Sequence, residues 1–297
     1  MDIHSKRVLI TGINGFTGRP LRAALEDHGA NVFGITNNLQ DEKSDQVLEV
    51  DLEDAELLNK TFDQVRPDYV IHLAGLSFAN HKNPLPYYQT NVIGSENLLK
   101  ACLQKGQQIE ALVLASSAAV YGAPTSEYVS ESEPVSPISH YGFSKLAMEF
   151  IAQTYSDELP IIITRPFNYV GAEQAARFLI PKIANHFNRK CLEIELGNTN
   201  VIREFSDIRD VVQIYIRLLE GDGRGIVNIC SGRAHSLDEV LATFTEISGH
   251  EVKVKVNPNF VRKNDIKSLV GDSAKLQEMT NYKFQYTLKA TLSSMLK

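Results

Sequence analysis

The sequence has few cysteines, no excess of positive charge and no long apolar run, and each of these absences excludes a class of protein. Three widely spaced cysteines among 297 residues suit neither a disulfide framework nor a zinc site, so we expect free thiols and no metal. A formal net charge of -6 argues against nucleic acid as a partner, because binding it normally requires a basic surface. No apolar stretch approaches the roughly 18 residues of a membrane span.

The first residues, MDIHSKRVLITG, also lack the features of an export signal. They pass from charged residues into a short apolar run, without a long hydrophobic region or a small-residue cleavage site. We therefore expect a cytoplasmic protein. With 43% hydrophobic residues, the chain is long enough to bury one large core or two smaller cores joined tightly.

What the sequence does contain is an alternation of short β-branched runs with helical patterns. Because parallel strands need helical crossovers, this order predicts an α/β fold, a Rossmann-type doubly wound parallel sheet with helices on both faces. The alternation loosens after residue 165, which predicts a smaller C-terminal lobe. We expect a Rossmann domain over residues 1–165, to which the chain returns near residues 205–230. The second lobe is expected mainly over residues 166–297. The predicted strands are Val8–Thr11, Val32–Ile35, Val47–Val50, Tyr69–Leu73, Leu112–Ser116, Ile161–Thr164 and Ile226–Ile229, and the predicted helices are Leu21–His28, Ala55–Gln64, Tyr87–Gln104, His140–Tyr155, Arg177–Asn188 and Asp207–Glu220.

A glycine-rich segment, TGINGFTG, follows the first predicted strand and opens a helix, which is the context that a dinucleotide site requires. Gly12 would allow the tight turn, Gly15 the close approach of the pyrophosphate and Gly18 close packing of the helix. Free N–H groups at the helix start would bind the anion. An ordinary glycine turn is the alternative interpretation. The same segment supplies three more expected cofactor contacts, Asn14, Phe16 and Thr17.

The residues after the second and third predicted strands bear on the choice of cofactor. Thr36 and Asn37 stand where an acidic residue would accept the adenosine ribose hydroxyls and repel the extra phosphate of NADPH. Since no arginine stands there either, NADPH is favoured only slightly over NADH. Asp51, followed by Leu52, could accept from the adenine amine, or it could cap the next helix.

Tyr141 and Lys145 lie in a segment with helical spacing, so that both side chains face the same side one turn apart. A nearby ammonium group stabilises the phenolate and lowers the tyrosine pKa from about 10, which lets the phenol transfer protons near neutral pH. In a chain with 11 tyrosines, Tyr-x-x-x-Lys alone is weak evidence. Two serines at the end of an apolar strand strengthen it, because ligands bind at that edge of the sheet. For Ser116 we expect strand-end hydrogen bonding, and for Ser117 a hydroxyl that holds a carbonyl oxygen.

These motifs occur in the order found in extended short-chain dehydrogenases/reductases, and the chain resembles that family over nearly its whole length. The resemblance rests on the glycine motif, His72-Leu73-Ala74-Gly75, Asn91 in TNVIG, Ser117, Tyr141-x-x-x-Lys145 and Arg165-Pro166-Phe167-Asn168. It implies that Ser117, Tyr141 and Lys145 are catalytic and that Lys145 also holds the nicotinamide ribose. It further implies cofactor contacts from Leu73, Ala74, Gly75, Asn91 and Pro166 and a substrate contact from Asn168. His72 and His140 are interpreted as structural residues.

The positions after Ser117 narrow the reaction that the resemblance implies. Sugar-nucleotide 4,6-dehydratases resemble this chain but place acidic residues there, whereas Ala118 and Ala119 cannot exchange protons. The epimerising reductases that make GDP-fucose have a cysteine where Ala119 stands. Hydride transfer alone remains, carried out by Ser117, Tyr141 and Lys145.

The second lobe resembles segments with which relatives bind a nucleotide diphosphate. Arg203 is the expected main phosphate clamp and Arg262 a second one, because guanidinium groups bind diphosphate oxygens in pairs. Arg177 and Lys182 are further expected substrate contacts, although a solvated surface charge is an equal interpretation of Arg177. Asp207 and Asp210 begin an apolar helix, whose dipole explains them.

REFSDIRDVV at residues 203–212, followed by NICSG at 228–232, looks most like the corresponding segments of the GDP-4-keto-6-deoxymannose reductases. We therefore expect NAD(P)H-dependent reduction of the C4 ketone of a nucleotide-linked 4-keto-6-deoxy sugar, with GDP-4-keto-6-deoxymannose as the preferred substrate, giving a GDP-6-deoxyhexose. The chain departs from these relatives at Glu204, at Lys263 and in Asn281-Tyr282-Lys283-Phe284, which leaves the base and the sugar open.

The same resemblance leaves two alternative functions open and predicts an oligomeric state. A UDP-sugar 4-epimerase uses the same groups but retains NAD, and its usual acidic residue after the second strand is missing here. A non-catalytic cofactor-sensing protein is a further alternative, although such proteins generally lack the tyrosine and the lysine. Relatives often dimerise through the helices that match Tyr87–Gln104 and His140–Tyr155, so we expect a homodimer.

Overall fold

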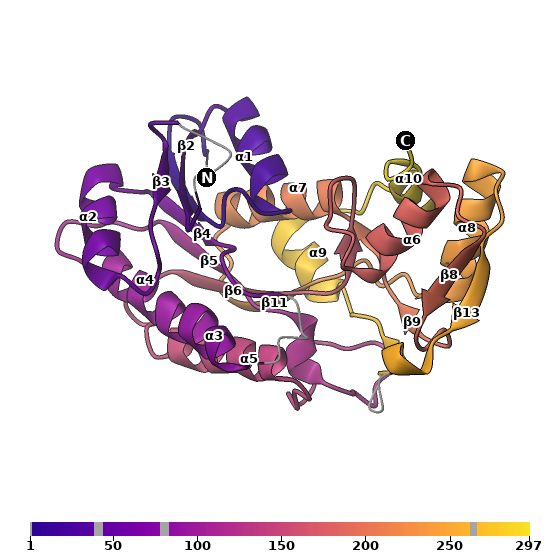
Figure 1. Cartoon of the computed structure of the whole chain (residues 1–297). Helices are drawn as coiled ribbons and strands as arrows, with labels where there is room; N and C mark the ends of the chain where they lie inside the picture. Colours follow the sequence, from indigo (N-terminus) through magenta and orange to yellow (C-terminus); the bar gives the residue numbers. More distant parts are fainter. Residues whose placement is uncertain (1, 39–43, 78–82, 262–265) are drawn as a thin grey trace.

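The computed structural model describes residues 2–38, 44–77, 83–261 and 266–297, which form a central sheet and a smaller lobe beside it (Figure 1). All seven strands of the sheet are parallel, in the order β11-β6-β5-β4-β1-β2-β3. Every residue of β4 and β6 is buried, as expected for parallel strands that are covered on both faces. The strands are β1 (Arg7–Thr11), β2 (Asn31–Thr36), β3 (Val47–Glu49), β4 (Tyr69–His72), β5 (Ala111–Ala115), β6 (Ile161–Pro166) and β11 (Gly225–Ile229).

The order of the strands reverses at β1, which pairs with both β2 and β4. From β1 the chain first builds outward through β2 and β3, and then crosses to β4 and builds in the other direction. Ligands of such sheets bind outside the carboxyl ends of the strands at this reversal. The sheet confirms the Rossmann-type fold expected from the sequence and places the glycine-rich segment at the reversal.

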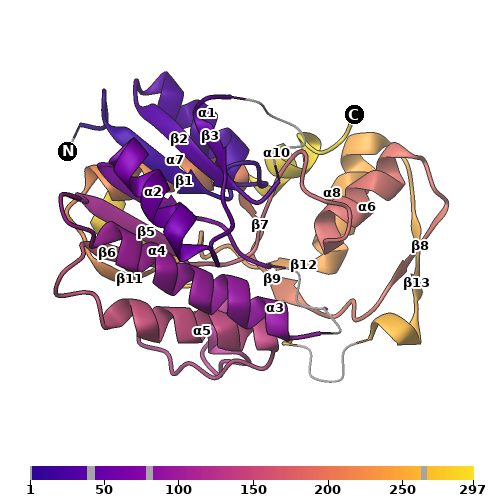
Figure 2. The same ribbon diagram turned by 60° about the vertical axis from the view of Figure 1, so that its left-hand side comes forward.

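Helices cover both faces of the sheet, as Figure 2 shows from a second side. One face is covered by α2 (Ala55–Val65), α4 (Ser95–Cys102) and α5 (His140–Gln153), whose apolar side chains share a core with β4, β5 and β6. The other face is covered by α1 (Gly18–Asp27) and α7 (Ile208–Glu220), which contribute to a second core. Because α7 belongs to the later half of the chain, the sheet is completed by residues from both halves.

The single helix predicted over Tyr87–Gln104 is divided into three pieces. These are α3 (Leu85–Tyr88), the π-helical turn η1 (Gln89–Gly94) and α4. Such wide turns occur inside α-helices mostly at functional sites. Here the turn carries Asn91, whose side chain is fully buried.

The smaller lobe has its own apolar core, in which the Phe187 and Phe244 rings stack at 5.2 Å. Its helix α6 begins at Leu179 rather than at Arg177, which lies before the helix.

Within the described residues, no helix is long and apolar enough to cross a membrane. The remaining elements are η2 (Ala118–Tyr121), β7 (Tyr169–Val170), α6 (Leu179–Asn188), β8 (Glu193–Leu196), β9 (Ile202–Arg203), β10 (Ser206–Asp207), β12 (His235–Ser236), α8 (Leu237–Ser248), β13 (Lys253–Val256), η3 (Pro258–Phe260), β14 (Ser268–Leu269), α9 (Ala274–Thr280) and α10 (Leu288–Ser293).

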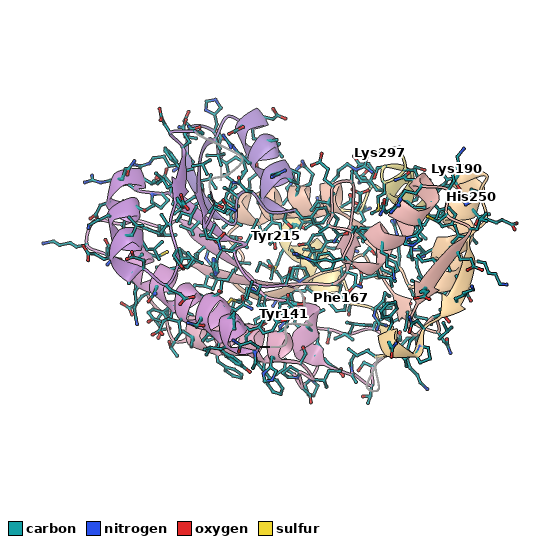
Figure 3. All side chains as sticks on the ribbon, in the orientation of Figure 1. Tyr141, Phe167, Lys190, Tyr215, His250 and Lys297 are labelled. Atoms are coloured by element: carbon teal, nitrogen blue, oxygen red, sulfur yellow. The ribbon has the colours of Figure 1, made fainter. Side chains whose placement is uncertain are left out.

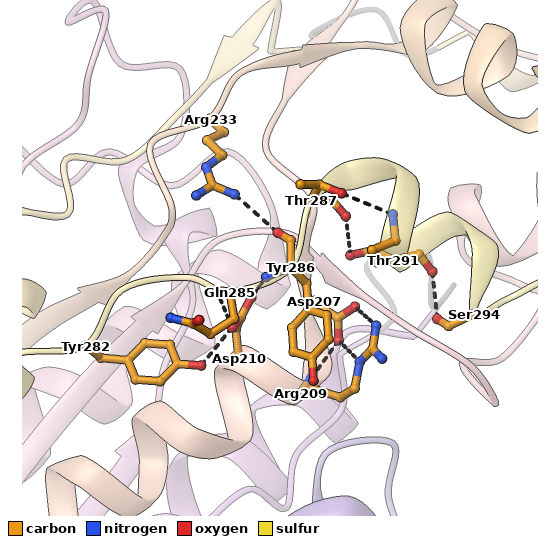
Figure 4. Close-up of polar contacts among 11 residues, drawn as sticks. Asp207, Arg209, Asp210, Arg233, Tyr282, Gln285, Tyr286, Thr287, Thr291 and Ser294 are labelled. Atoms are coloured by element: carbon orange, nitrogen blue, oxygen red, sulfur yellow. Dashed lines mark hydrogen bonds and ion pairs between the residues drawn. The ribbon is translucent and has the colours of Figure 1, made fainter.

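The two carboxylates at the start of α7 have different partners (Figure 4). Asp207 caps the helix by accepting from the Arg209 backbone N–H at 2.8 Å, and it pairs with the Arg209 guanidinium. Asp210 is fully buried and accepts from the Tyr282 hydroxyl at 2.7 Å and from the Gln285 N–H at 2.9 Å. The helix dipole alone therefore does not explain Asp210, which anchors the segment that leads to α10.

Candidate active site

The glycine-rich segment packs against the end of β4, and two of its glycines have no room for a side chain. Gly12 has a positive φ of 71°, and a Cβ there would lie 2.9 Å from the Ala74 backbone nitrogen. At Gly18 a Cβ would lie 2.4 Å from the Gly12 and Ile13 carbonyl oxygens. Gly15 is exposed to solvent. Without side chains at Gly12 and Gly18, the start of α1 can lie close to the end of β4, where the strand order of the sheet reverses. The backbone at Gly15 stays accessible to a ligand.

This segment fits the pyrophosphate of a dinucleotide. Thr17 is the residue before α1, and its side chain does not cap the helix. The first turn of α1 contains no acidic residue. Asn14 Oδ1 is buried and accepts no hydrogen bond within the described part of the chain. A bound pyrophosphate would meet the free N–H groups at the helix start, which attract anions.

Tyr169, from β7, covers the same segment, a contact that the sequence did not reveal. The Phe16 and Tyr169 rings stack at 5.8 Å with an interplanar angle of 13°, and the Tyr169 hydroxyl lies 2.8 Å from Thr17 Oγ1. Tyr169 directly follows Asn168, so its position in the sequence motif was the only available signal. The contact joins the dinucleotide segment to the first strand of the second half.

The ends of β2 and β3 place the other expected adenosine contacts. Thr36 is buried, its hydroxyl donates to the Asn38 carbonyl at 3.1 Å, and Asn37 is exposed beside it. Asp51 is exposed and accepts from the Glu53 backbone N–H at 3.0 Å. The alternative interpretation of Asp51 as the helix cap is wrong, because Asp54 caps α2 by accepting from the Leu57 N–H at 2.9 Å.

The serine, tyrosine and lysine of the expected catalytic group come together between β5 and α5, and Figure 3 shows Tyr141 near the middle of the molecule. Ser139 caps α5 by accepting from the Gly142 N–H at 3.1 Å, which places Tyr141 and Lys145 in the first two turns. Ser117 caps η2, because its hydroxyl accepts from the Ala119 N–H at 3.1 Å. Burial raises the pKa of Tyr141 to about 12, and a hydrogen bond with Ser117 opposes that rise. At neutral pH the Tyr141 phenol therefore carries its proton and can donate it, and the expectation that its pKa lies below 10 is wrong, because burial has the larger effect.

Lys145 is only 5% exposed, and its ammonium group donates to the Ala115 carbonyl at 2.7 Å. Burial lowers the pKa of Lys145 to about 8, and the Glu149 carboxylate opposes this effect. A Cβ on Gly75 would lie 3.2 Å from Lys145 Nζ, so the glycine at this position leaves room for the lysine. Lys145 is held at the end of β5, beside the residues that follow β4.

Asn91 connects the residues that follow β4 to α5 by hydrogen bonds. Its Oδ1 accepts from the Leu76 N–H at 2.9 Å, and its Nδ2 donates to the Ser144 hydroxyl at 2.9 Å. Leu76 follows the expected cofactor contacts over residues 73–75, so Asn91 holds their backbone in place. This arrangement suits the organising role implied for Asn91 by the family resemblance.

The two histidines near these motifs make structural contacts. His72 is buried, with Nδ1 at 2.7 Å from Thr11 Oγ1 and Nε2 at 2.8 Å from Ser95 Oγ. Burial lowers the pKa of His72 to about 3, and the charge of Lys145 acts in the same direction. His140 Nδ1 lies 2.9 Å from the Tyr88 hydroxyl. A neutral His72 thus serves as a hydrogen-bonding link between strands and helix.

The expected substrate residues lie on several elements: Arg203 contacts the residue before β14, and Lys182 contacts η3. Arg203 donates to the Ile202 carbonyl at 2.8 Å and to the Lys267 carbonyl at 3.2 Å. Lys182 lies 4.8 Å from the centre of the Phe260 ring and donates to the Glu195 carbonyl at 2.6 Å. These two cations therefore already contact protein groups, which a bound diphosphate would share or replace.

The other expected substrate residues differ in their surroundings. Asn168 is exposed after β6, and its carbonyl accepts from the Ser206 N–H at 3.0 Å, while Pro166 is buried at the end of that strand. Arg177 is exposed, with its guanidinium 5.4 Å from the centre of the Phe178 ring. Arg262 lies outside the described residues.

Comparison with known proteins places this geometry in a family. Residues 9–295 match the family described as GDP-mannose 4,6 dehydratase. The chain belongs to this GDP-mannose 4,6-dehydratase family.

Relatives in the GDP-mannose 4,6-dehydratase family carry different names. The chain is 33% identical over 294 residues to the GDP-6-deoxy-D-talose 4-dehydrogenase of Aggregatibacter actinomycetemcomitans, covering 98% of this chain and 97% of that one. It is 30% identical over 308 residues to a UDP-glucose 4-epimerase of Azospirillum brasilense, covering 94% and 87%. RMD from Pseudomonas aeruginosa, solved in complex with NADPH, superposes with a TM-score of 0.85 at 27% identity, covering 99% and 97%.

Family membership confirms the resemblance to extended short-chain dehydrogenases/reductases. The chain is an NAD(P)-dependent enzyme that modifies a nucleotide sugar. Ser117 is nevertheless followed by two alanines, where the sequence comparison leads us to expect acidic residues in a 4,6-dehydratase. Ala118 and Ala119 form the first turn of η2 directly after Ser117, and neither residue has a group that exchanges protons.

Proposed function

We propose that this enzyme reduces the C4 ketone of a GDP-linked 4-keto-6-deoxy sugar with NADPH or NADH. The observation that supports reduction best is the composition of the site. Ser117, Tyr141 and Lys145 are assembled as a proton-donating group, while Ala118 and Ala119 stand where a dehydratase needs acids. The similarity to a GDP-6-deoxy-D-talose 4-dehydrogenase supports the C4 position, because reduction and oxidation there are the two directions of one reaction.

Each residue has a distinct part in the proposed reaction. The nicotinamide cofactor, when bound, supplies the hydride that is transferred to the C4 carbon. Ser117 donates a hydrogen bond to the C4 oxygen and so stabilises the negative charge that develops there. Tyr141 donates its proton to that oxygen. Lys145 stabilises the resulting phenolate and holds the nicotinamide ribose.

The cofactor and the substrate are proposed to meet where the two halves of the chain join. The glycine-rich segment would hold the pyrophosphate of the cofactor, and the neutral Thr36 and Asn37 would tolerate the extra phosphate of NADPH. In the lobe over residues 166–297, Arg203 and Lys182 would bind the substrate diphosphate, together with Asn168, Arg177 and Arg262.

We also propose a homodimer, because the face that includes α3, η1 and α5 exposes large apolar side chains. Ile93 and Phe143 are each 49% exposed, and Phe150 is 58% exposed. Apolar groups gathered in this way are typical of surfaces that become buried on association.

The reaction is tested by mixing the purified enzyme with NADPH or NADH and GDP-4-keto-6-deoxymannose and following the loss of reduced-nicotinamide absorbance. Parallel assays with dTDP-, CDP- and UDP-linked 4-ketosugars identify the base. Tyr141→Phe should lower kcat at least about 100-fold, within the range of lost general acid catalysis, while NADPH binding stays intact. Full activity of this variant would refute the role of Tyr141.

The similarity to a UDP-glucose 4-epimerase supports a second candidate, an NAD-retaining nucleotide-sugar 4-epimerase. It uses the same three side chains but returns the hydride to the opposite face of the ketone. Denaturing the purified protein and measuring released NAD separates the two. Stoichiometric NAD, combined with no oxidation of NADPH or NADH by any ketosugar, would favour the epimerase.

A further inference from the structure

A buried ion pair lies directly behind the proposed catalytic group. Glu149 follows Lys145 by one turn of α5, and its carboxylate contacts Arg165 of β6, with 2.6 Å between Glu149 Oε2 and Arg165 Nη2. The Arg165 and Glu149 side chains are only 4% and 1% exposed. Desolvation of such a pair offsets most of its attraction, and apolar residues of similar volume often stabilise a fold equally well. Stability alone therefore does not account for two charges at this place.

Hydrogen bonds from this pair reach the side chains of Ser116 and Tyr121, which stand before and after Ser117 in the sequence. On one side, the Ser116 hydroxyl donates to Glu149 Oε1, and the Ser116 N–H donates to the Thr164 carbonyl at 2.8 Å. On the other side, Arg165 Nη1 donates to the Tyr121 hydroxyl at 3.0 Å.

The Tyr121 side of the network continues to the edge of the sheet. The Tyr121 hydroxyl donates to Asn228 Oδ1 of β11 at 2.7 Å. The Arg165 guanidinium also lies 4.8 Å from the centre of the Tyr121 ring. The pair thus ties the end of η2, the short helix that Ser117 precedes, to β6 and β11 and to the residue that follows β5.

The same carboxylate also acts on Lys145. Its negative charge raises the pKa of Lys145 and so opposes the effect of burial. Among the described residues, Tyr141 precedes Lys145 by one turn of the same helix, His72 of β4 interacts with the charge of Lys145, and Arg165 of β6 lies beyond Glu149. His72 stays neutral, with a pKa of about 3, so it adds no charge beside Lys145, and the interaction that raises the pKa of Lys145 is with the Glu149 carboxylate.

We propose that Glu149 and Arg165 form a positioning unit, which fixes the backbone on both sides of Ser117 and keeps Lys145 in its ammonium form during reduction. This inference rests on the reductase function proposed above. Both side chains are almost inaccessible to ligands, so they act through Ser117 and Lys145 rather than on the substrate. A displacement of the reacting groups by about 1 Å is enough to slow an enzyme about 100-fold.

The first test replaces the pair by apolar residues of similar size, Glu149→Met together with Arg165→Met. We expect this double variant to fold and to bind NADPH, because no charge is left unpaired. Its kcat should fall about 100-fold, with a nearly unchanged KM for the nucleotide sugar, since an interaction with the reacting groups alone has been removed. Tyr282→Phe, which removes a buried hydrogen bond far from the ion pair, is the matched control and should keep its kcat.

The second test separates charge from structure. Glu149→Gln keeps the shape of the side chain but removes the charge, so the pKa of Lys145 should fall below its value of about 8. Because the ammonium form is the active one, the alkaline limb of the kcat profile should move to lower pH. Arg165→Lys keeps a cation beside Glu149 and should leave this limb where it is in the wild type.

Titration of ¹⁵N-labelled Lys145 by NMR, assigned with Lys145→Arg, follows the same shift without turnover. If the wild type reduces no ketosugar, the proposed function fails, while the titration still tests the action of Glu149 on Lys145. Wild-type kcat and pH profile in the double variant, or an unchanged Lys145 titration in Glu149→Gln, would overturn the positioning unit.

Discussion

Two fully buried glutamates, one in each half of the chain, are stabilised by different kinds of partner. Glu149 forms an ion pair with Arg165, which balances its charge. Glu204, between β9 and β10, forms no ion pair within the described part of the chain, and the guanidinium of the preceding Arg203 donates to carbonyl groups. It accepts instead from the Ser231 N–H at 2.6 Å and from the Gly271 N–H at 2.8 Å. Burial raises the pKa of Glu204 to about 7, although these N–H groups oppose the rise.

The difference shows how the same side chain serves two purposes. Beside the proposed catalytic group, the charge of Glu149 is fixed by its partner. At the junction of the lobes, Glu204 joins the residues after β11 to those after β14, and its charge depends on pH. A change of pH near neutrality should therefore affect the residues that Glu204 joins at the junction of the lobes.

The largest effect is expected from Glu149→Ala, which leaves the Arg165 guanidinium buried without its carboxylate. Breaking a buried pair from one side costs about 3–5 kcal/mol of unfolding free energy. Urea denaturation at pH 7 measures this loss. The Glu149→Met and Arg165→Met double variant is the control, and an equal loss in both would contradict the explanation by an unpaired charge.

Glu204 should give the wild type a pH-dependent stability that Glu204→Gln lacks. Its pKa is about 7 in the folded chain and 4.5 in the unfolded chain, so the folded state binds the proton more tightly. The resulting stability is complete below about pH 4.5 and is lost as the pH rises to about 7, and it amounts to about 3 kcal/mol.

The measurement for Glu204 is the unfolding free energy of both proteins at several pH values between 5 and 8. The difference between wild type and Glu204→Gln should shrink as the pH rises and become constant above about pH 7. Parallel curves for the two proteins would show that Glu204 stays ionised throughout this range.

A smaller effect is expected from Tyr282→Phe at a third buried carboxylate. Asp210 loses one donor there but keeps the Gln285 N–H at 2.9 Å and the Tyr286 N–H at 3.2 Å. The loss of one hydrogen bond of this kind costs about 1 kcal/mol. Thermal unfolding of the variant beside the wild type checks this value, and a loss as large as that of Glu149→Ala would contradict it.

The sequence predicted best what depends on neighbouring residues. The strand predicted over Tyr69–Leu73 is β4, Tyr69–His72, and the one predicted over Leu112–Ser116 is β5, Ala111–Ala115. Both were predictable because an apolar run flanked by polar residues is a local signal. The glycine-rich segment was recognised for the same reason. The break inside the helix predicted over Tyr87–Gln104 was missed, since no proline interrupts that range.

The partners of individual side chains could not be predicted in the same way. Glu149 and Arg165, or Phe16 and Tyr169, meet only after the sheet has formed, and nothing near either residue in the sequence indicates the other. The motif around Arg203 suggested a phosphate ligand, but it did not indicate that the guanidinium donates to the Ile202 and Lys267 carbonyls. The backbone path was readable from local pattern, whereas polar pairing depends on the tertiary fold.

The position of β11 at the edge of the sheet has a consequence for the order in which a ribosome can build this enzyme. The strand that protects β6 is reached only at Gly225, and α7, which covers one sheet face, begins only at Ile208. A nascent chain that ends near residue 166 therefore carries an open strand edge and a bare apolar face, both of which promote aggregation. For anyone who wants to divide this enzyme into two complementing fragments, the end of β6 is thus a poor place to cut.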